Sequence, residues 1–341
     1  MAKVGIRDVA KAAQVSVTTV SHALSDAHGS RVNAATRDHV RAVAEELGYA
    51  PNRLASGLRN QRSYLLGMVN DQIATTPFAG EMILGAQDAA YERGWLLMML
   101  DTASDPELEK KQINTLLQHQ VDGIVYAKMY HQRIATPTEL AGVPTVLLDA
   151  TSDLGSISSV VPDEVAAART AVRTLIDAGH RTIGFINNID DIPATHGRFQ
   201  GYVEALGEAG IDFDPALVAT AESRAEGGRI AAQHLLSLPT RPTALFCFSD
   251  RMAMGAYQAA GSLGMTIPHD LSVIGIDNLE LIAEGLWPGL TTVALPHYGM
   301  GRWAVTQLLD EIEASGDEEP VHMIFDCPLV QRGSVAPPLH I

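Results

Sequence analysis

Ten side chains in this sequence have types and positions suited to binding a small polyhydroxylated molecule. Carboxylates and guanidinium groups bind vicinal hydroxyls as paired acceptors and donors, and an aromatic ring stacks on a sugar face. Each of the ten stands at or after the end of an expected strand, the edge at which open α/β sheets bind ligands. Any one of them, taken alone, also fits a turn or a helix cap. The candidates are Asn70, Phe78, Lys128, Asp149, Asn187, His196, Arg198, Ser249, Asp277 and His297.

The start of the chain is suited to a second kind of chemistry, the reading of DNA bases. Apolar residues recur at helical spacing from Ile6 to Ala13, and Ser16 is placed to cap a second short helix from Val17 to Leu24. Two short helices with so tight a connection indicate a helix-turn-helix, in which the first residues of the second helix reach base edges in the major groove. The side chains placed for bases are Val17, Thr18 and His22, and those placed for phosphate oxygens are Thr19 and Ser21.

A third helix and a weak helical segment complete this N-terminal region. Asn33 is placed to cap a helix over 34–47, and Gly48 ends it. In the segment 49–59 that follows, Pro51 precedes the helical part and Gly57 weakens it by about 1 kcal/mol relative to Ala. So short a segment cannot hold a helix alone in water. We therefore expect it to become ordered only against a partner.

The distribution of charge supports a DNA-binding N-terminus. The chain has 341 residues and a net charge of −16, which is unusual for a DNA-binding protein. Residues 1–62, however, hold nine Lys or Arg and five Asp or Glu, whereas the remainder holds 15 and 35. The basic charge is thus concentrated where DNA is expected, and the acidic remainder favours solubility.

Composition excludes several other classes of protein. With 46% hydrophobic and 19% charged residues, the chain should be globular. No apolar run reaches 18 residues and the N-terminus lacks the apolar core of a signal peptide, so neither a membrane partner nor export is expected. Cys247 and Cys327 have no metal-ligand spacing and indicate buried thiols in a reducing cytoplasm.

The elements that position the ligand-binding candidates begin at Ser63. Apolar runs alternate there with amphipathic helices, which predicts parallel sheets covered on both faces, and the two successive sets of such units predict two lobes. A cleft between lobes is a usual place for a small-molecule site. The main expected strands are 63–70, 95–102, 121–128, 144–150, 181–188, 243–250, 271–278 and 290–295, and the main expected helices are 77–94, 107–120, 163–179, 197–210, 226–238, 251–263 and 297–314.

Two alternative functions were weighed on the residues. For an enzyme, the segment from Gly299 to Ala304 matches the nucleotide fingerprint G-x-G-x-x-A. However, residues 296–298 intervene after the strand, no clear β-unit with an acidic residue follows, and close helix packing explains the glycines more simply. The sequence has no G-x-S-x-G, H-E-x-x-H or P-loop motif, and its histidines lack ligand spacing. We expect no catalytic residue, metal or cofactor. The other alternative, a solute-binding protein, conflicts with the helix-turn-helix and the missing signal peptide.

The N-terminal region resembles the DNA-binding headpiece and hinge helix of the lac-repressor (LacI/GalR) family of bacterial transcriptional regulators. The similarity continues through essentially the whole chain, and its motif set is highly specific. The matching motifs are DVA at 8–10, VSVTTVS at 15–21, TRDHV at 36–40, LGYAPNRLA at 47–55 and Leu58.

This resemblance implies an α/β protein in three parts. A helix-turn-helix headpiece over 1–50 and a hinge helix with its linker over 51–62 precede a two-lobed, periplasmic-binding-protein-like body over 63–341 with parallel sheets. The chain should cross between the lobes near 161, 290 and 321. The first lobe would comprise 63–161 and 291–321, and the second 162–290 and 322–341.

The resemblance also implies roles for particular residues. Leu58 would be the wedge that two hinge helices push into the minor groove, with Ala55 facing the groove floor. Arg198, in R-F-Q-G-Y, and Asp277, in I-G-I-D-N, match effector-binding positions. His22 departs from the Arg common in the family, and Ser249 from the Asn common in its sugar binders. The expected DNA-binding residues are Arg7, Ser16, Val17, Thr18, Thr19, Ser21, His22, Asn33, Tyr49, Asn52, Arg53, Ala55 and Leu58.

Together these observations predict a cytoplasmic, homodimeric transcriptional repressor of sugar-uptake or catabolic genes. It would bind near-palindromic double-stranded operator DNA, because one headpiece makes few phosphate contacts. A small effector, expected to be a sugar, would bind between the lobes, change their angle and unfold the hinge helices. The alternative is a corepressor-activated regulator that responds to a non-sugar metabolite or a protein coregulator.

Overall fold

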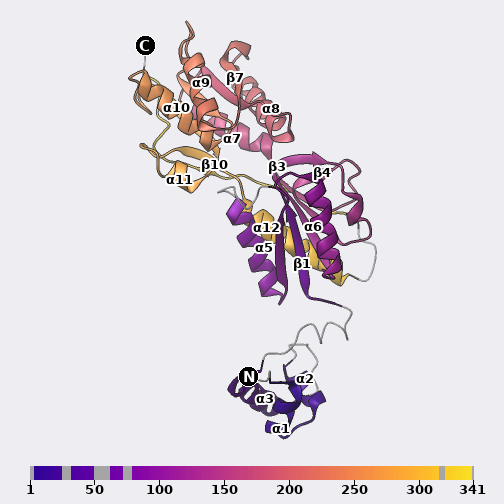
Figure 1. Cartoon of the computed structure of the whole chain (residues 1–341). Coiled ribbons are helices and arrows are strands. Elements are labelled where there is room, and N and C mark those ends of the chain that lie inside the picture. The colour runs from indigo at the N-terminus through magenta and orange to yellow at the C-terminus, as the bar shows by residue number, and fades with distance from the viewer. Residues whose placement is uncertain (1–3, 25–31, 50–61, 72–78, 315–318, 340–341) are drawn as a thin grey trace. The chain divides into compact units, whose positions relative to one another are not determined.

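The computed structural model describes residues 4–24, 32–49, 62–71, 79–314 and 319–339 (Figure 1). The chain divides into two compact units, with the boundary between Tyr64 and Leu65. The expected hinge helix lies outside the described residues, as do five expected site residues. These are Asn52, Arg53, Ala55, Leu58 and Phe78.

The first unit is a small helical bundle. Its described helices are α1 (Ile6–Ala12), α2 (Val17–Leu24) and α3 (Ala34–Glu46). The expected caps are both present, because Ser16 Oγ accepts the Thr19 N–H at 3.0 Å and Asn33 Oδ1 accepts the Thr36 N–H at 2.8 Å. The bundle encloses a core of small aliphatic side chains: Val9, Ala10, Ala13, Val20, Ala23, Val40 and Ala44.

The second unit contains two six-stranded sheets. In the first sheet all neighbouring strands pair in parallel, and in the second only β12, at the edge, runs antiparallel to its neighbour. The first sheet has the order β11 (His322–Phe325), β5 (Ser159–Pro162), β4 (Thr145–Ser152), β3 (Gly123–Ile134), β1 (Leu65–Asn70), β2 (Leu96–Asp101). The second has the order β12 (Leu329–Val330), β10 (Thr291–Ala294), β9 (Ser272–Asp277), β8 (Ala244–Cys247), β6 (Ile183–Asn188), β7 (Val218–Ala221).

Helices pack against each sheet and against each other in pairs, which confirms the expected α/β architecture. With the first sheet lie α5 (Ala79–Glu92), α6 (Pro106–Gln118), α12 (His297–Glu313) and the 3₁₀ helix η2 (Thr138–Leu140). With the second lie α7 (Glu164–Asp177), α8 (Pro193–Glu208), α9 (Ala225–Leu236), α10 (Asp250–Ser262), α11 (Glu280–Ala283) and η3 (Pro215–Leu217). We call the two assemblies the first and second lobes. In the described part of the chain no helix is long and apolar enough to cross a membrane.

Strand pairing corrects two of the three expected crossings between the lobes. The first crossing lies between β5 and α7, as expected near 161. The strand 291–294 pairs with β9, so the second crossing falls after Ala294 and not near 290. The strand 322–325 pairs with β5, so the third falls after Phe325 and not near 321. Both strands are short apolar runs, and an apolar pattern alone does not specify which sheet a strand joins.

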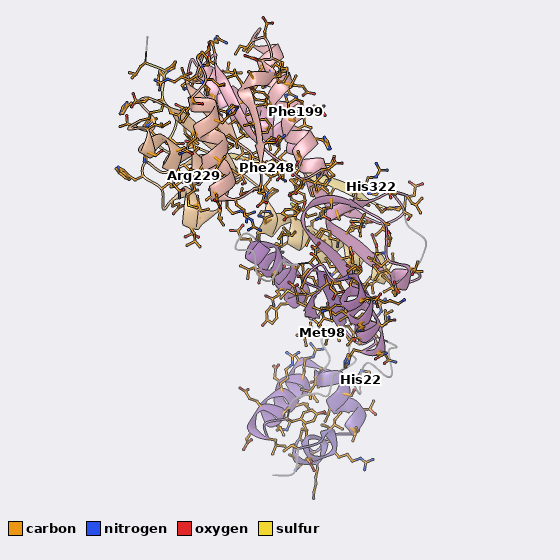
Figure 2. The ribbon with its side chains drawn as sticks, turned by 45° about the horizontal axis from the view of Figure 1, so that its top comes forward. His22, Met98, Phe199, Arg229, Phe248 and His322 are labelled. Carbon is orange, nitrogen blue, oxygen red and sulfur yellow. The ribbon has the colours of Figure 1, made fainter. Side chains whose placement is uncertain are left out.

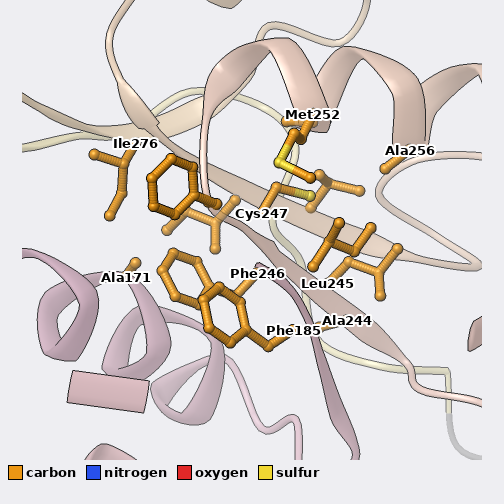
Figure 3. Close-up of a cluster of buried hydrophobic side chains, with 14 of the residues drawn as sticks. Ala171, Phe185, Ala244, Leu245, Phe246, Cys247, Met252, Ala256 and Ile276 are labelled. Carbon is orange, nitrogen blue, oxygen red and sulfur yellow. The ribbon is translucent and has the colours of Figure 1, made fainter. Parts of the chain in front are cut away.

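The core of the second lobe is densely aromatic and aliphatic (Figure 3). The rings of Phe185 and Phe246, from β6 and β8, stack with centroids 4.5 Å apart. Cys247 and Met252 extend this layer, and both side chains are fully buried. Burial raises the pKa of the Cys247 thiol, so this thiol stays protonated and behaves as a small apolar group. The core therefore holds β8 rigidly where its last residues lead into the site described below.

Glycine permits the close approach of α5 and α12. A Cβ atom on Gly301 would lie 2.1 Å from the carbonyl oxygen of Met82, and one on Gly85 would lie 2.1 Å from that of Tyr298. Only residues without a side chain allow two helix backbones to approach so closely. The glycine of the G-x-G-x-x-A segment that faces α5 therefore serves helix packing.

Candidate functional site

The first unit presents the start of α2 to solvent. Val17 is 43% exposed although apolar, and Thr18 and His22 are also exposed, so the three side chains expected to reach bases are accessible together. Thr19 is half-buried, and its hydroxyl lies 2.8 Å from Ser16 Oγ. An exposed apolar side chain beside hydroxyl and imidazole groups at a helix N-terminus suits contact with base edges and thymine methyl groups.

The other expected DNA-binding residues of this unit occupy more structural positions. Ser16 and Asn33 use their side-chain oxygens as helix caps, and Tyr49 packs against the core. Ser21 is half-buried on α2, whereas Arg7 is exposed in the first turn of α1. A capping oxygen is already an acceptor, so Ser16 and Asn33 would contact a phosphate through the groups that capping leaves available.

Five of the ten expected effector-binding residues meet in one cavity of the second unit. Residues of both lobes line this cavity. The lining side chains that were expected are Asp149, Arg198, Ser249, Asp277 and His297. The lining residues that were not expected are Met129, Tyr130, His131, Glu164, Ala194, Ser223, Phe248, Arg251 and Leu295.

Arg198 is fixed by three contacts within the second lobe. Its Nε donates to Glu164 Oε2 at 2.7 Å, and its NH1 donates to the carbonyl oxygen of Phe248. The guanidinium also lies over the Phe248 ring, 4.2 Å from the centroid. Arg198 and Glu164 are only 3% and 5% exposed. Their opposite charges therefore compensate each other for the loss of water around them. A guanidinium held this way is preorganised towards a ligand.

Phe248 connects the second sheet to the cavity (Figure 2). It follows β8 directly, and Ser249 then caps α10 by accepting the Met252 N–H at 3.4 Å. The hydroxyls of Ser249 and Ser223 lie 2.9 Å apart and both line the cavity. The apolar β8 and the cap of α10 thus bring a ring and two hydroxyls to the carboxyl end of the second sheet.

The carboxyl groups of the cavity differ in how they are held. Burial raises the pKa of Asp149 well above its usual value, and burial raises that of Asp277 to about 6. Behind them, Asp250 accepts the Thr292 hydroxyl at 2.6 Å and the Leu279 N–H at 2.8 Å, which fixes the loop after Asp277. Asp277 itself has a positive φ of 130°, so this loop turns sharply at the cavity.

His297 occupies the first position of α12 and is 4% exposed. Burial lowers the pKa of its imidazole to about 4, and the neighbouring positive charge of Arg198 acts in the same direction. The ring is therefore neutral at physiological pH and contributes hydrogen bonding without charge to the cavity.

Four other expected residues do not line this cavity. Asn70 donates to the Leu100 carbonyl at 3.1 Å, and Asn187 donates to that of Thr195 at 3.3 Å. Lys128 pairs with the Asp71 carboxylate at 3.3 Å. The exposed side chain of His196 pairs with Asp191 at 2.6 Å, and Phe78 lies outside the described residues.

Some of the cavity residues that the sequence analysis did not select could have been selected from the sequence, and others could not. Phe248 and Leu295 stand at strand ends and could have been included by the same rule as Ser249. Glu164 follows the first crossing between lobes, a position that the expected domain boundaries already identified. Tyr130 and His131 come from an irregular part of β3, which alternation of apolar residues does not reveal. Within the described ranges no group of three or more His, Cys, Asp or Glu side chains is arranged to hold a metal ion.

Comparisons with known proteins agree on one family. Residues 5–52 match the family model described as bacterial regulatory proteins, lacI family, and residues 63–333 match that described as periplasmic binding proteins and sugar binding domain of LacI family. The transcriptional repressor CytR of Escherichia coli K12 is 37% identical over 342 residues, covering 96% of this chain and 95% of the relative. Among solved structures, the lac repressor dimer bound to operator and the anti-inducer ONPF has a TM-score of 0.79 and 26% identity, covering 98% of this chain and all of that one. The regulator CelR in complex with cellobiose has a TM-score of 0.71 and 30% identity, covering 97% and all.

Proposed function

Because this chain belongs to the lacI family of bacterial regulatory proteins and is a DNA-binding repressor, we propose that a sugar bound in the cavity between its lobes releases it from its operator. The observation that carries the proposal is the preorganised Arg198 beside the carboxyl group of Asp277 in one cavity. A guanidinium donates to hydroxyl oxygens and a carboxylate accepts from hydroxyls, which together match a vicinal diol.

The charge of the cavity favours a neutral ligand. The carboxyl groups of Glu164 and Asp277 are matched in number by the guanidinium groups of Arg198 and Arg251, and burial disfavours ionisation of the remaining carboxyl group, Asp149. A phosphate or carboxylate group would therefore find no excess of positive charge to compensate its desolvation in a site of low dielectric. A neutral sugar avoids this cost, and the CelR relative was solved with cellobiose. These points support an uncharged sugar over a sugar phosphate.

The position of the cavity supports a ligand-dependent change of lobe angle. Residues of both lobes line it, so a ligand bound there contacts both lobes and its binding depends on the angle between them. The effector then selects one of two lobe arrangements. A full reversal of operator occupancy from 99:1 requires the ligand to discriminate between the arrangements by about 5.5 kcal/mol.

The proposal includes a homodimer on a near-palindromic operator. One headpiece offers few phosphate contacts, and the lac repressor relative was solved as a dimer on operator DNA. Large apolar side chains exposed on both lobes offer contact surfaces, among them Tyr91 at 83% and Trp287 at 94%. Hinge residues Ala55 and Leu58 would enter the minor groove at the operator centre, and their separation would end specific binding.

Operator release by sugars tests the proposal. An operator would first be obtained by selection from random duplexes, and binding would then be followed by fluorescence anisotropy with mono- and disaccharides, sugar phosphates, purines and nucleosides. We expect a neutral sugar to weaken operator binding at least tenfold and to stabilise the protein by about 2.7 kcal/mol at 100 times its dissociation constant.

Two variants make the result specific. Asp277→Asn should bind the operator normally and fail to release it, whereas Asp212→Asn, which alters an exposed carboxylate, should behave as wild type. Release by a purine or nucleoside instead of a sugar would refute the sugar and keep the repressor. Tighter operator binding in the presence of a sugar would make that sugar a corepressor and refute the proposed sign of the switch.

A further inference from the structure

Strand β3 is irregular where it passes the cavity. Its register with the neighbouring β4 holds up to Ala127 and resumes at Gln132. Between these two residues β3 has four, residues 128–131, where β4 has only Asp149. Extra residues on one strand of a pair bend that strand and re-aim its side chains. We call residues 128–131 the β3 bulge.

The first half of the β3 bulge is anchored within the first lobe. Lys128 Nζ lies 3.3 Å from the Asp71 carboxylate and 3.6 Å from that of Glu109. The Met129 N–H donates to Asp71 Oδ1 at 3.0 Å. These contacts draw Lys128 away from the cavity, and they explain why this residue, expected in the site, is absent from its lining. The other three residues of the bulge, Met129, Tyr130 and His131, line the cavity.

Among the buried polar atoms that lack a hydrogen-bond partner in the described residues, two line the cavity from the first lobe. They are His131 Nδ1 and Asp149 Oδ1, and both residues line the cavity. The Asp149 side chain is 4% exposed, so solvent does not substitute for the partner. Nearly all buried polar atoms in native proteins are hydrogen-bonded. Two exceptions from opposite sides of the same bulge, in the same cavity, therefore mark a place for a polar group of a ligand.

Burial is the main cause of the pKa shifts of this pair, and neighbouring charged groups add to it or oppose it. Burial lowers the pKa of His131, while Glu164 raises it and Arg198 lowers it further. Burial raises the pKa of Asp149, with Glu164 and Asp71 acting in the same direction and Arg198 against it. Burial thus disfavours the charged form of both groups. A hydroxyl group both donates and accepts, so it satisfies such a pair, whereas an ionic group finds no counter-charge on it.

We propose that the β3 bulge is the selectivity element of the site, in which His131 Nδ1 and Asp149 Oδ1 bind one hydroxyl region of an uncharged sugar and His131 discriminates between epimers. The inference rests on the proposed function, that a sugar binds in this cavity. Arg198 and Asp277 then bind the ligand from the second lobe, and the β3 bulge reads it from the first. A site that reads a hydroxyl with a buried polar group rejects the analogue lacking that hydroxyl most strongly.

Calorimetric titration of the full chain with single sugars tests this assignment. The probes are D-ribose, D-arabinose, D-xylose, D-glucose, D-galactose and cellobiose, which include pairs that differ at one carbon. For the sugar that wild type binds most tightly, we expect His131→Ala to weaken binding ten- to a hundredfold and to bring the ratio over its epimer close to one. His131→Gln, which keeps a hydrogen-bonding group, should recover part of both. His234→Ala, which removes an exposed histidine of α9, should change neither.

The outcomes separate this inference from the proposed function. If Asp277→Asn abolishes sugar binding while His131→Ala retains both affinity and epimer preference within twofold, the sugar site stands and the selectivity role of the β3 bulge is refuted. Asp149→Asn provides a second test, because loss of epimer preference there supports the pair. If wild type binds none of the six sugars, the proposed function and this inference fail together. Far-ultraviolet circular dichroism confirms that each variant is folded.

Discussion

Replacing His297 by glutamine should make the protein more resistant to acid. His297 is 4% exposed, and its pKa is lowered from 6.5 to about 4 by burial, with Arg198 as the second cause. The folded state therefore favours the neutral ring, whereas the unfolded chain takes up a proton below pH 6.5. Stability contributed by this difference is complete above pH 6.5 and is lost progressively as the pH falls towards 4.

The size of the effect follows from the two pKa values. Proton uptake by the unfolded chain lowers the free energy of unfolding negligibly at pH 7.5, by about 1 to 2 kcal/mol at pH 5.5 and by about 2 to 3 kcal/mol at pH 4.5. Glutamine is uncharged at all these values and retains hydrogen-bonding capacity, so the variant should lack this loss. With a denaturant slope of about 3 kcal/mol per molar for a body of this size, the difference at pH 4.5 is roughly 0.5 to 1 M in urea midpoint.

Urea unfolding followed by circular dichroism at pH 7.5, 5.5 and 4.5 measures this effect. The quantity to compare is the fall in midpoint within each protein, because contributions of other titrating groups, such as His131 and Asp277, are common to both. His234→Gln, at an exposed position, serves as the control and should follow wild type. If His297→Gln loses as much midpoint between pH 7.5 and 4.5 as wild type does, His297 does not carry the acid sensitivity and the reasoning from its burial is wrong.

Three further changes test the packing, the ion pair and the headpiece. Gly301→Ala should lower the free energy of unfolding by at least about 1 to 3 kcal/mol, because its Cβ would overlap a backbone oxygen of α5. The control Gly207→Ala has open space around it and should be neutral or stabilising by up to ~1 kcal/mol. Equal urea midpoints of the two variants would contradict the close packing. Arg198→Met should cost about 3 to 5 kcal/mol by leaving the Glu164 carboxylate unpaired, and Glu164→Gln in the same chain should restore most of it; an unaffected single variant would mean that the pair is dispensable for folding. His22→Arg should change the preferred base at one position of each half-site in a binding-site selection, and an identical selected profile would show that this side chain reads no base.

Local patterns were sufficient to predict the helices of the headpiece and most elements of the body. Ser16 and Asn33 are short polar residues directly before apolar-periodic segments, and both form the caps that their positions indicate. The start of α8 was placed four residues late, at 197, although Pro193 offered the signal of a proline in the first helical turn. The type of each helix or strand is thus determined largely by residues close in the sequence. Where a helix begins or ends is determined by single residues, such as a capping residue or a proline.

The candidate site could be predicted only in part, because its composition depends on contacts between distant segments. The rule that ligands bind at strand ends selected Asp149 and Asp277, and both line the cavity. The same rule also selected Lys128, which pairs with Asp71 because the β3 bulge turns it away. Glu164 was missed because it is recruited by a residue 34 positions further along the chain, Arg198. No periodicity encodes such a pairing, and a three-residue insertion in one strand changes which side chains reach the site.

The order of residues along the first lobe has a consequence for its synthesis. Helix α12 packs against β3, β4 and β5 and against α5, yet it follows nearly the whole second lobe in the chain. At ribosomal rates of about 5 to 20 residues per second, α12 emerges roughly 10 to 50 s after β1. During this interval β3, β4 and β5 lack the contacts that α12 later makes with them, while the second lobe already has all but its last strand. We therefore expect the first lobe to complete its core only after α12 has been translated.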